Sequence, residues 1–350
     1  MSDRRLLDAR GLALLAASSL TVMANATIAP ALPGIRDAFS TTPGIETLVG
    51  LVMTLPSLVV ILTAGLWGVV IDRYGRRNAL IACVALFGLA GASGAFVSTL
   101  GEMFLGRALL GLAVGGVMTA TTALAIDLHS GPDRDRFTGY QGAAMSMGGV
   151  LFLLAGGALA EWSWRGAFLV YLVALAILVA VVLFVRDAPK TPRVSGAVPA
   201  RMPWGFLAFQ CTVAVVVMLV FYMVPVKLAF LLRELGVDRP IFAGVAVACG
   251  TVTGVASALA YGRMRARLSA PMVFVVAFGC MAIGFGCIGV ASTYATILVG
   301  TAINGFGIGF VMPNGMVWLM SRVPPEMRGR ASGLVTMSVF VGQFLSPLAS

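Results

Sequence analysis

The stretch GVVIDRYGRR, residues 68–77, places one carboxylate and three guanidinium groups between two long apolar segments. Asp72 lies where a helix is expected to end, so its carboxylate can pair with an arginine or with the positive N-terminal end of another helix. Gly68 would let two helices approach closely, and Gly75 would permit a tight turn. The stretch therefore predicts a charged hairpin that forms breakable ionic contacts, built from Gly68, Asp72, Arg73, Gly75, Arg76 and Arg77.

A partner for this charged hairpin stands at the end of a later apolar segment. Asp127 directly follows residues 102–126 and is a candidate ion-pair partner for Arg73 or Arg76. Arginines alone can serve to orient a membrane segment. That task requires neither an aspartate nor two fixed glycines, so we favour the ion-pairing hairpin over a simple anchor.

Two basic residues lie inside apolar segments. A buried arginine is costly in a bilayer and usually faces a polar cavity, which is one interpretation of Arg107. Two alternatives remain open, because Arg107 could instead pair with Glu102 or extend outward to the membrane surface. Lys227 lies six residues before Arg233, and we expect it to extend to the surface rather than to bind an anion.

Groups that could carry protons or bind metals are scarce. All 14 acidic residues lie at the ends of apolar segments or between them. A proton carrier would therefore be Asp37, Glu46 or Glu102, titrating if buried beside Arg107 and water. The only histidine, His129, is expected in a solvated loop, and the five cysteines have no metal-binding spacing. We expect no metal, no cofactor and no enzyme activity; a proton gradient, another ion or no coupling at all remain alternatives.

The composition is that of a membrane protein. Of the 350 residues, 59% are hydrophobic and 11% are charged, whereas soluble domains carry about 25% charged residues. Continuous apolar runs of about 20 residues are typical of transmembrane helices rather than of barrel strands. The net charge of +10 comes from short clusters between these runs, which does not indicate a nucleic-acid partner. The expected surroundings are a lipid bilayer.

The hydropathy pattern predicts eleven transmembrane helices. Of the 24 Lys and Arg residues, 18 lie at the N-terminus and in alternate connections, and four lie in the opposite connections. This asymmetry predicts a cytoplasmic N-terminus. The predicted spans are 11–35, 46–71, 78–97, 102–126, 137–160, 166–185, 204–232, 240–262, 271–292, 294–320 and 331–350.

An internal repeat relates the two halves of the chain. A shift of 194 residues superposes Gly68 on Gly262 and Gly148 on Gly342 without a gap. We therefore expect two bundles related by pseudo-twofold symmetry, as in transporters built from parallel repeats. The sixth span predicts a partner near 360–379, so we expect a twelfth helix beyond Ser350. The predicted domains are an N-terminal six-helix bundle over 1–185, a cytoplasmic linker over 186–203 and an incomplete C-terminal bundle over 204–350.

The charged hairpin, the linker and the repeat together resemble the major facilitator superfamily. The signature of that family between spans two and three is Gly-x-x-x-Asp-Arg-x-Gly-Arg-Arg, which residues 68–77 match completely. The resemblance implies a latch in which Asp72 meets the N-terminus of span eleven, near Arg330, and closes the cytoplasmic side. The second copy has Ala266 in place of Asp72, so only the first half is expected to hold a strong latch.

Two other stretches compare with family motifs. Arg107 followed by Gly111 resembles the second motif of the family, on span four, and this resemblance favours the interpretation that Arg107 faces a polar cavity. Drug exporters of the family carry an aspartate midway along span one, where this chain has Asn25, which cannot carry a proton at ordinary pH. The Gly-Pro pair that antiporters carry in span five is replaced by Phe152 and Leu153.

The resemblance implies a secondary transporter with a central cavity, working by alternating access. We expect efflux of drug-like or amphiphilic small molecules by a monomer in the bacterial inner (plasma) membrane. The alternative is import or export of a defined metabolite, such as a sugar, nucleobase or siderophore, by uniport or symport. The candidate cavity residues are Asn25, Arg107, Met118, Met145, Tyr222, Lys227, Asn304, Asn314, Trp318 and Gln343.

Overall fold

A computed structural model describes residues 6–129, 131–186, 202–324 and 327–349. Within these ranges, the side chains at positions 26, 72, 131, 132 and 135 are outside the description. Most of the predicted linker, 187–201, also lies outside the described residues. The described part of the chain consists of helices and contains no strand, which confirms the all-helical prediction.

The helices of the first half begin and end close to the predicted spans, and the first span is broken. Thr27 and Ile28 interrupt it ahead of Pro30, because proline cannot donate the backbone hydrogen bond that would continue the helix. A short 3-10 turn also interrupts the sixth span. The elements are α2 (Ala9–Ala26), η1 (Ala29–Ala31), α3 (Leu32–Ala38), α4 (Ile45–Tyr74), α5 (Arg76–Ser93), α6 (Leu100–Leu128), α7 (Gly131–Ala160), α8 (Gly166–Leu169), η2 (Val170–Leu172) and α9 (Val173–Phe184).

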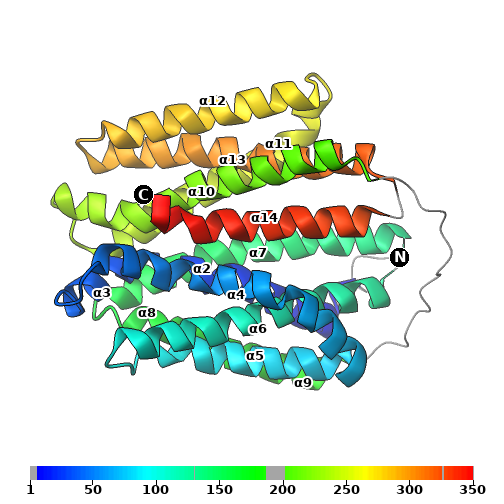
Figure 1. The fold of residues 1–350 in the computed structure, drawn as a ribbon, viewed down its shortest axis with the longest axis horizontal. Coiled ribbons are helices and arrows are strands. Elements are labelled where there is room, and N and C mark those ends of the chain that lie inside the picture. The colour runs from blue at the N-terminus through cyan, green and yellow to red at the C-terminus, as the bar shows by residue number, and fades with distance from the viewer. Residues whose placement is uncertain (1–5, 130, 187–201, 325–326, 350) are drawn as a thin grey trace. The chain divides into compact units, whose positions relative to one another are not determined.

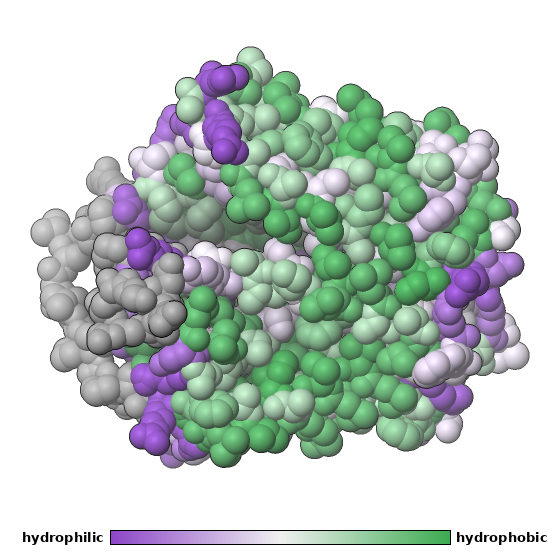
Figure 2. Space-filling model, turned by 180° about the vertical axis from the view of Figure 1, so that it is seen from behind, coloured by the Kyte–Doolittle hydropathy of each residue, from purple (hydrophilic) through white to green (hydrophobic). Residues whose placement is uncertain are grey.

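The second half contributes five long helices: α10 (Trp204–Glu234), α11 (Pro240–Arg265), α12 (Ala270–Gly289), α13 (Tyr294–Arg322) and α14 (Arg328–Ala349). Ten segments of the described chain are long and apolar enough to cross a membrane. The 18-residue α5, which is rich in alanine and glycine, is the remaining predicted span. Hydrophobic residues cover the length of the helices, and hydrophilic residues gather toward their ends (Figure 2), as expected for a multi-pass membrane protein.

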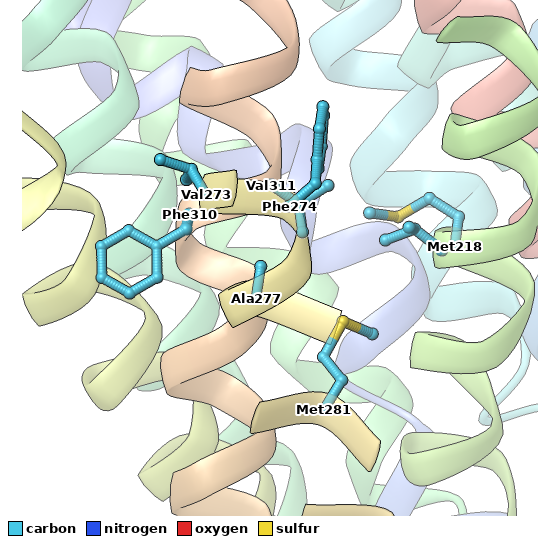
Figure 3. Close-up of a cluster of buried hydrophobic side chains, with 8 residues drawn as sticks. Met218, Val273, Phe274, Ala277, Met281, Phe310 and Val311 are labelled. Atoms are coloured by element: carbon cyan, nitrogen blue, oxygen red, sulfur yellow. The ribbon is translucent and has the colours of Figure 1, made fainter. Parts of the chain in front are cut away.

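The contacts divide the chain into two compact units, Met1–Arg193 and Val194–Ser350. In the first unit, α6 packs against α4 and α5, α7 packs against α2, and α9 packs against α5 and α2 (Figure 1). In the second unit, α13 packs against α11 and α12, and α10 packs against α14. One cluster of buried side chains in the second unit comes from α10, α12 and α13, with Met281 of α12 directed toward Met218 of α10 (Figure 3).

The two units use the same glycine contact to bring two helices together. A Cβ at Gly111 of α6 would lie 2.6 Å from the carbonyl oxygen of Pro56 in α4. A Cβ at Gly305 of α13 would overlap the carbonyl oxygen of Gly250 in α11. Gly111 and Gly305 are 194 residues apart, and so are Pro56 and Gly250. The spacing of the sequence repeat is therefore also a spacing of equivalent backbone contacts.

Candidate functional site

The charged hairpin is a sharp turn between two long helices. Gly75 stands between α4 and α5 with φ +88° and ψ 150°, a backbone conformation that is essentially open only to glycine. Its N–H donates to Ile71 at 3.1 Å, and its carbonyl accepts from Ala79 at 3.2 Å. Gly68 has a different environment, because a Cβ there meets no heavy atom within 4 Å among the described residues. Close packing of helices within the first unit therefore does not require a glycine at position 68.

One arginine of the hairpin pairs with the end of α6. The guanidinium of Arg76 forms an ion pair with Asp127, and these side chains are 20% and 5% exposed. Asp127 lies in the last turn of α6, where the helix dipole disfavours a negative charge, so the guanidinium offsets an unfavourable position. Of the two arginines considered as partners, the structure pairs Arg76, whereas Arg73 is exposed and lies over the ring of Tyr74.

A second arginine binds the end of α9. Arg77 donates from Nε to the carbonyl of Val185 at 2.6 Å and from Nη2 to that of Val182 at 2.9 Å. These carbonyls end a helix and have no intrahelical donor. The hairpin is therefore tied to α6 and α9 by two consecutive arginines. The side chain of Asp72 lies outside the described residues, so its partner stays a prediction.

Arg107 is enclosed within the first unit and is 2% exposed. It donates from Nε to Val52 at 2.8 Å, and from Nη2 to Ala24 at 2.5 Å and to Met53 at 3.4 Å, all backbone carbonyls. Its Nη1 donates to the hydroxyl of Tyr171 at 3.0 Å. Arg107 therefore neither extends to the membrane surface nor pairs with Glu102, and both of these alternatives are wrong. The guanidinium lies between helices, and no carboxylate of the described residues forms an ion pair with it.

Two of the acceptors of Arg107 are carbonyls that lack helical donors. Pro56 has no N–H, so the carbonyl of Val52, one turn earlier in α4, is left without its usual partner. The carbonyl of Ala24 lies in the last turn of α2, where carbonyls also lose intrahelical donors. It accepts from the Tyr171 hydroxyl at 2.8 Å as well. Arg107 thus supplies donors to a carbonyl freed by a proline within α4 and to a carbonyl at the end of α2.

The candidate proton carriers do not surround this arginine. Asp37, Glu46 and Glu102 are all exposed. Asp37 forms a surface ion pair with Arg36 at 3.5 Å. Glu102 accepts from the N–H groups of Ser98 and Thr99 in a capping box that begins α6. The condition for a titrating carboxylate beside Arg107 is therefore not met in this structure.

The remaining cavity candidates have diverse environments. Asn25 donates to the Ser57 hydroxyl at 2.9 Å, and both residues are buried. Asn314 donates to the carbonyl of Ala270 at 2.9 Å and is fully buried, so it joins α13 to the start of α12. Gln343 and Asn304 are buried, Lys227 is exposed, and four candidates are half-buried: Met118, Met145, Tyr222 and Trp318, whose ring meets those of Phe206, Phe209 and Phe274.

His129 is less accessible than expected. The residue follows α6 and is half-buried, with its ring 4.5 Å from that of Phe137. Burial, and secondly the charge of Arg10, lower the pKa of His129 below its usual 6.5. The prediction that His129 is solvated is therefore wrong, because the aromatic ring of Phe137 in α7 covers the imidazole.

Comparisons with known proteins support the architecture. The model of the Major Facilitator Superfamily matches residues 14–347. The puromycin resistance protein pur8 of Streptomyces alboniger is 29% identical over 283 residues, covering 76% of this chain and 53% of that protein. The bacillibactin exporter of Bacillus subtilis (strain 168) is 30% identical over 160 residues, covering 44% of this chain and 39% of that protein. The chain thus spans about half or less of these relatives' length.

A solved structure shows the fold. The chain matches a bacterial homologue of the human lysosomal transporter Spinster, in its inward-facing, occupied conformation, with a TM-score of 0.80 and 16% identity. The match covers 99% of this chain and 81% of that one. At this identity the likeness concerns the arrangement of the helices and not the transported molecule.

Proposed function

Because this chain belongs to the Major Facilitator Superfamily, we propose that it is a secondary transporter that moves small molecules across a membrane by alternating access. The observation that carries the proposal is the charged hairpin. Its turn at Gly75 and the ion pair between Arg76 and Asp127 hold the junction of α4 and α5 against its own bundle. Family membership also places the chain among transporters rather than enzymes.

We propose efflux of drug-like or amphiphilic compounds as the direction and substrate class. The support comes from the relatives, which are named as a puromycin resistance protein and a bacillibactin exporter. The half-buried methionines and aromatic residues among the cavity candidates suit a tolerant apolar site. The other candidate is import or export of a defined metabolite by uniport or symport, and the exposure of Asp37, Glu46 and Glu102 favours its form without proton coupling.

We propose that Asp72 acts as a latch in the transport cycle. With Arg76 and Arg77 at the start of α5 tied to α6 and α9, the turn that follows Asp72 is held in a fixed position. The Asp72 carboxylate then meets the N-terminal end of α14, which attracts negative charge, in the state that closes the cytoplasmic side. The corresponding membrane is the bacterial inner membrane, the N-terminus is cytoplasmic, and the working unit is a monomer.

Dye accumulation in bacteria that lack other exporters tests the direction. Cells that express the protein should accumulate less of several cationic and neutral dyes than cells with the Asp72→Asn variant expressed at the same level. Equal accumulation across the panel would argue against drug efflux. Proteoliposomes with an imposed pH gradient separate the coupling modes, because a proton antiporter responds to the gradient and a uniporter does not.

A further inference from the structure

A small cavity lies within the second unit, where α10, α11 and α13 meet. Its lining includes Phe221 and Pro225 of α10, Gly250 and Thr251 of α11, and Thr301 and Asn304 of α13. The cavity has room for about one water molecule. All of these helices belong to one compact unit.

Two of the residues that line the cavity carry a backbone or side-chain group without its usual partner. Asn304 is 2% exposed, and its Nδ2 has no hydrogen-bond partner among the described residues. Pro225 has no N–H, so the carbonyl of Phe221, one turn earlier in α10, is without its helical donor. Buried polar groups in native proteins are nearly always satisfied, by protein or by ordered water. Both groups therefore call for a small molecule with a donor and an acceptor.

The first unit fills the equivalent position with a side chain. The repeat spacing of 194 residues relates Thr301 to Arg107 and Gly250 to Pro56. Arg107 reaches the carbonyl freed by Pro56 with its guanidinium. Thr301 is much shorter, and its hydroxyl donates to Leu298 within its own helix at 3.0 Å. In the second unit the proline beside this position belongs to α10 rather than to α11, the counterpart of α4, and no side chain is long enough to reach the carbonyl that it frees.

We propose that this cavity binds one water molecule, which accepts a hydrogen bond from the Asn304 amide and donates one to the carbonyl of Phe221. A sodium ion fits less well, because the atom of Asn304 that lacks a partner is an N–H donor and the lining residues carry no negative charge. The water would supply a hydrogen-bond donor to the carbonyl freed by Pro225 in α10, as the guanidinium of Arg107 does for the carbonyl freed by Pro56 in α4. Unlike the guanidinium, it can exchange.

Radiolytic hydroxyl labelling of the purified full-length protein in lipid nanodiscs tests the site, because radicals formed from a bound water oxidise the side chains beside it. Pro56 is the matched control, as it is a buried proline inside a helix whose freed carbonyl is already bound by Arg107. We expect Pro225 to be oxidised several-fold faster than Pro56. Equal labelling of the two prolines in the unmodified protein would overturn the proposal without any variant.

Two variants of buried asparagines on α13 sharpen the test. Asn304→Leu removes the donor and fills the cavity with leucine, the residue that stands at the equivalent position in the first unit, Leu110. Labelling of Pro225 should then fall to the level of Pro56. Asn314→Leu removes an asparagine that is already bonded to Ala270, and labelling of Pro225 should persist. Unchanged labelling in Asn304→Leu would contradict the water site. Loss of labelling on adding sodium to the unmodified protein would assign the cavity to the cation instead.

Discussion

The guanidinium of Arg107 donates to the carbonyl oxygen of Val52 at 2.8 Å, and Val52 stands one turn before a proline that cannot supply that bond. A charge that would be costly in a membrane is thus held by backbone acceptors rather than by a carboxylate. The arrangement explains how the first unit tolerates both an interior arginine and an interior proline.

Replacing Arg107 should destabilise the protein. Arg107→Met leaves the Val52 carbonyl without a donor, at a cost of about 1–3 kcal/mol for a buried acceptor, and removes the bonds to Ala24 and Tyr171. Arg107→Lys should recover only part of the loss, because an ammonium lacks the planar fork that reaches several acceptors. Thermal unfolding in nanodiscs measures both, with exposed Arg134→Met as the control. An unchanged melting temperature for Arg107→Met would refute the role.

The ion pair between Arg76 and Asp127 should show a measurable coupling energy. In a double-mutant cycle with Arg76→Gln and Asp127→Asn, we expect a coupling of about 0.5–3 kcal/mol, since the pair is largely buried. The exposed pair of Arg36 and Asp37 is the internal comparison and should give about 0–1 kcal/mol. Chemical unfolding of the four proteins in each cycle provides the values. Similar coupling for both pairs would mean that burial adds nothing.

The two glycines of the charged hairpin should respond differently to alanine. Gly75→Ala forces a side chain into a glycine-only conformation, which costs about 1–3 kcal/mol. Gly68→Ala adds a methyl group to open space within the first unit and should leave the unfolding free energy nearly unchanged. If Gly68 allows two helices to approach closely during the transport cycle, Gly68→Ala will lower the transport rate while leaving the unfolding free energy unchanged. Equal destabilisation by both variants would contradict the geometry.

Asp72→Asn should slow transport more than it lowers expression, because the amide keeps the size of the side chain but loses the charge that a helix N-terminus attracts. Initial rates in proteoliposomes, normalised to the amount of reconstituted protein, measure the effect. Arg73→Gln, at the exposed neighbouring position, is the control for a general loss of surface charge. Full activity of Asp72→Asn would remove the latch from the mechanism.

The single histidine should contribute a pH-dependent term to stability. Burial, followed by the charge of Arg10, lowers the pKa of His129, while Asp133 and Asp8 act in the opposite direction. The unfolded chain therefore binds a proton first as the pH falls, so the contribution of His129 is complete above pH 6.5 and is lost below it. Unfolding at pH 7.5 and pH 5.5 should show a smaller pH difference in His129→Phe than in the unmodified protein. An equal difference would mean that the imidazole is solvated in the folded state.

The sequence predicted the long helices well, because continuous apolar runs report burial in lipid directly. The break in the first span was missed, since proline is common in membrane helices and Pro30 alone did not identify which residues leave the helix. The environment of Arg107 is not predictable in the same way, because its partners are mostly backbone carbonyls, which have no sequence signal of their own. The signal that could have found it was Pro56, which frees an acceptor on the neighbouring helix.

His129 and Arg77 show a second limit. Both contact residues that are distant along the chain or lie on the next helix, namely Val185 and Phe137, and hydropathy does not reveal such pairs. The ion pair at Asp127 could be anticipated because opposite charges at adjacent helix ends are rare in so apolar a chain.

The four bonds of Arg107 also determine how the first unit can deform. A tilt of α2 or α4 away from α6, or a shift of the segment that carries Tyr171, would pull at least one acceptor from the same guanidinium. These four segments are consequently expected to travel together as a stiff body. Independent bending in this protein should then concentrate in helices with a proline and no arginine beside it, of which α10 is one.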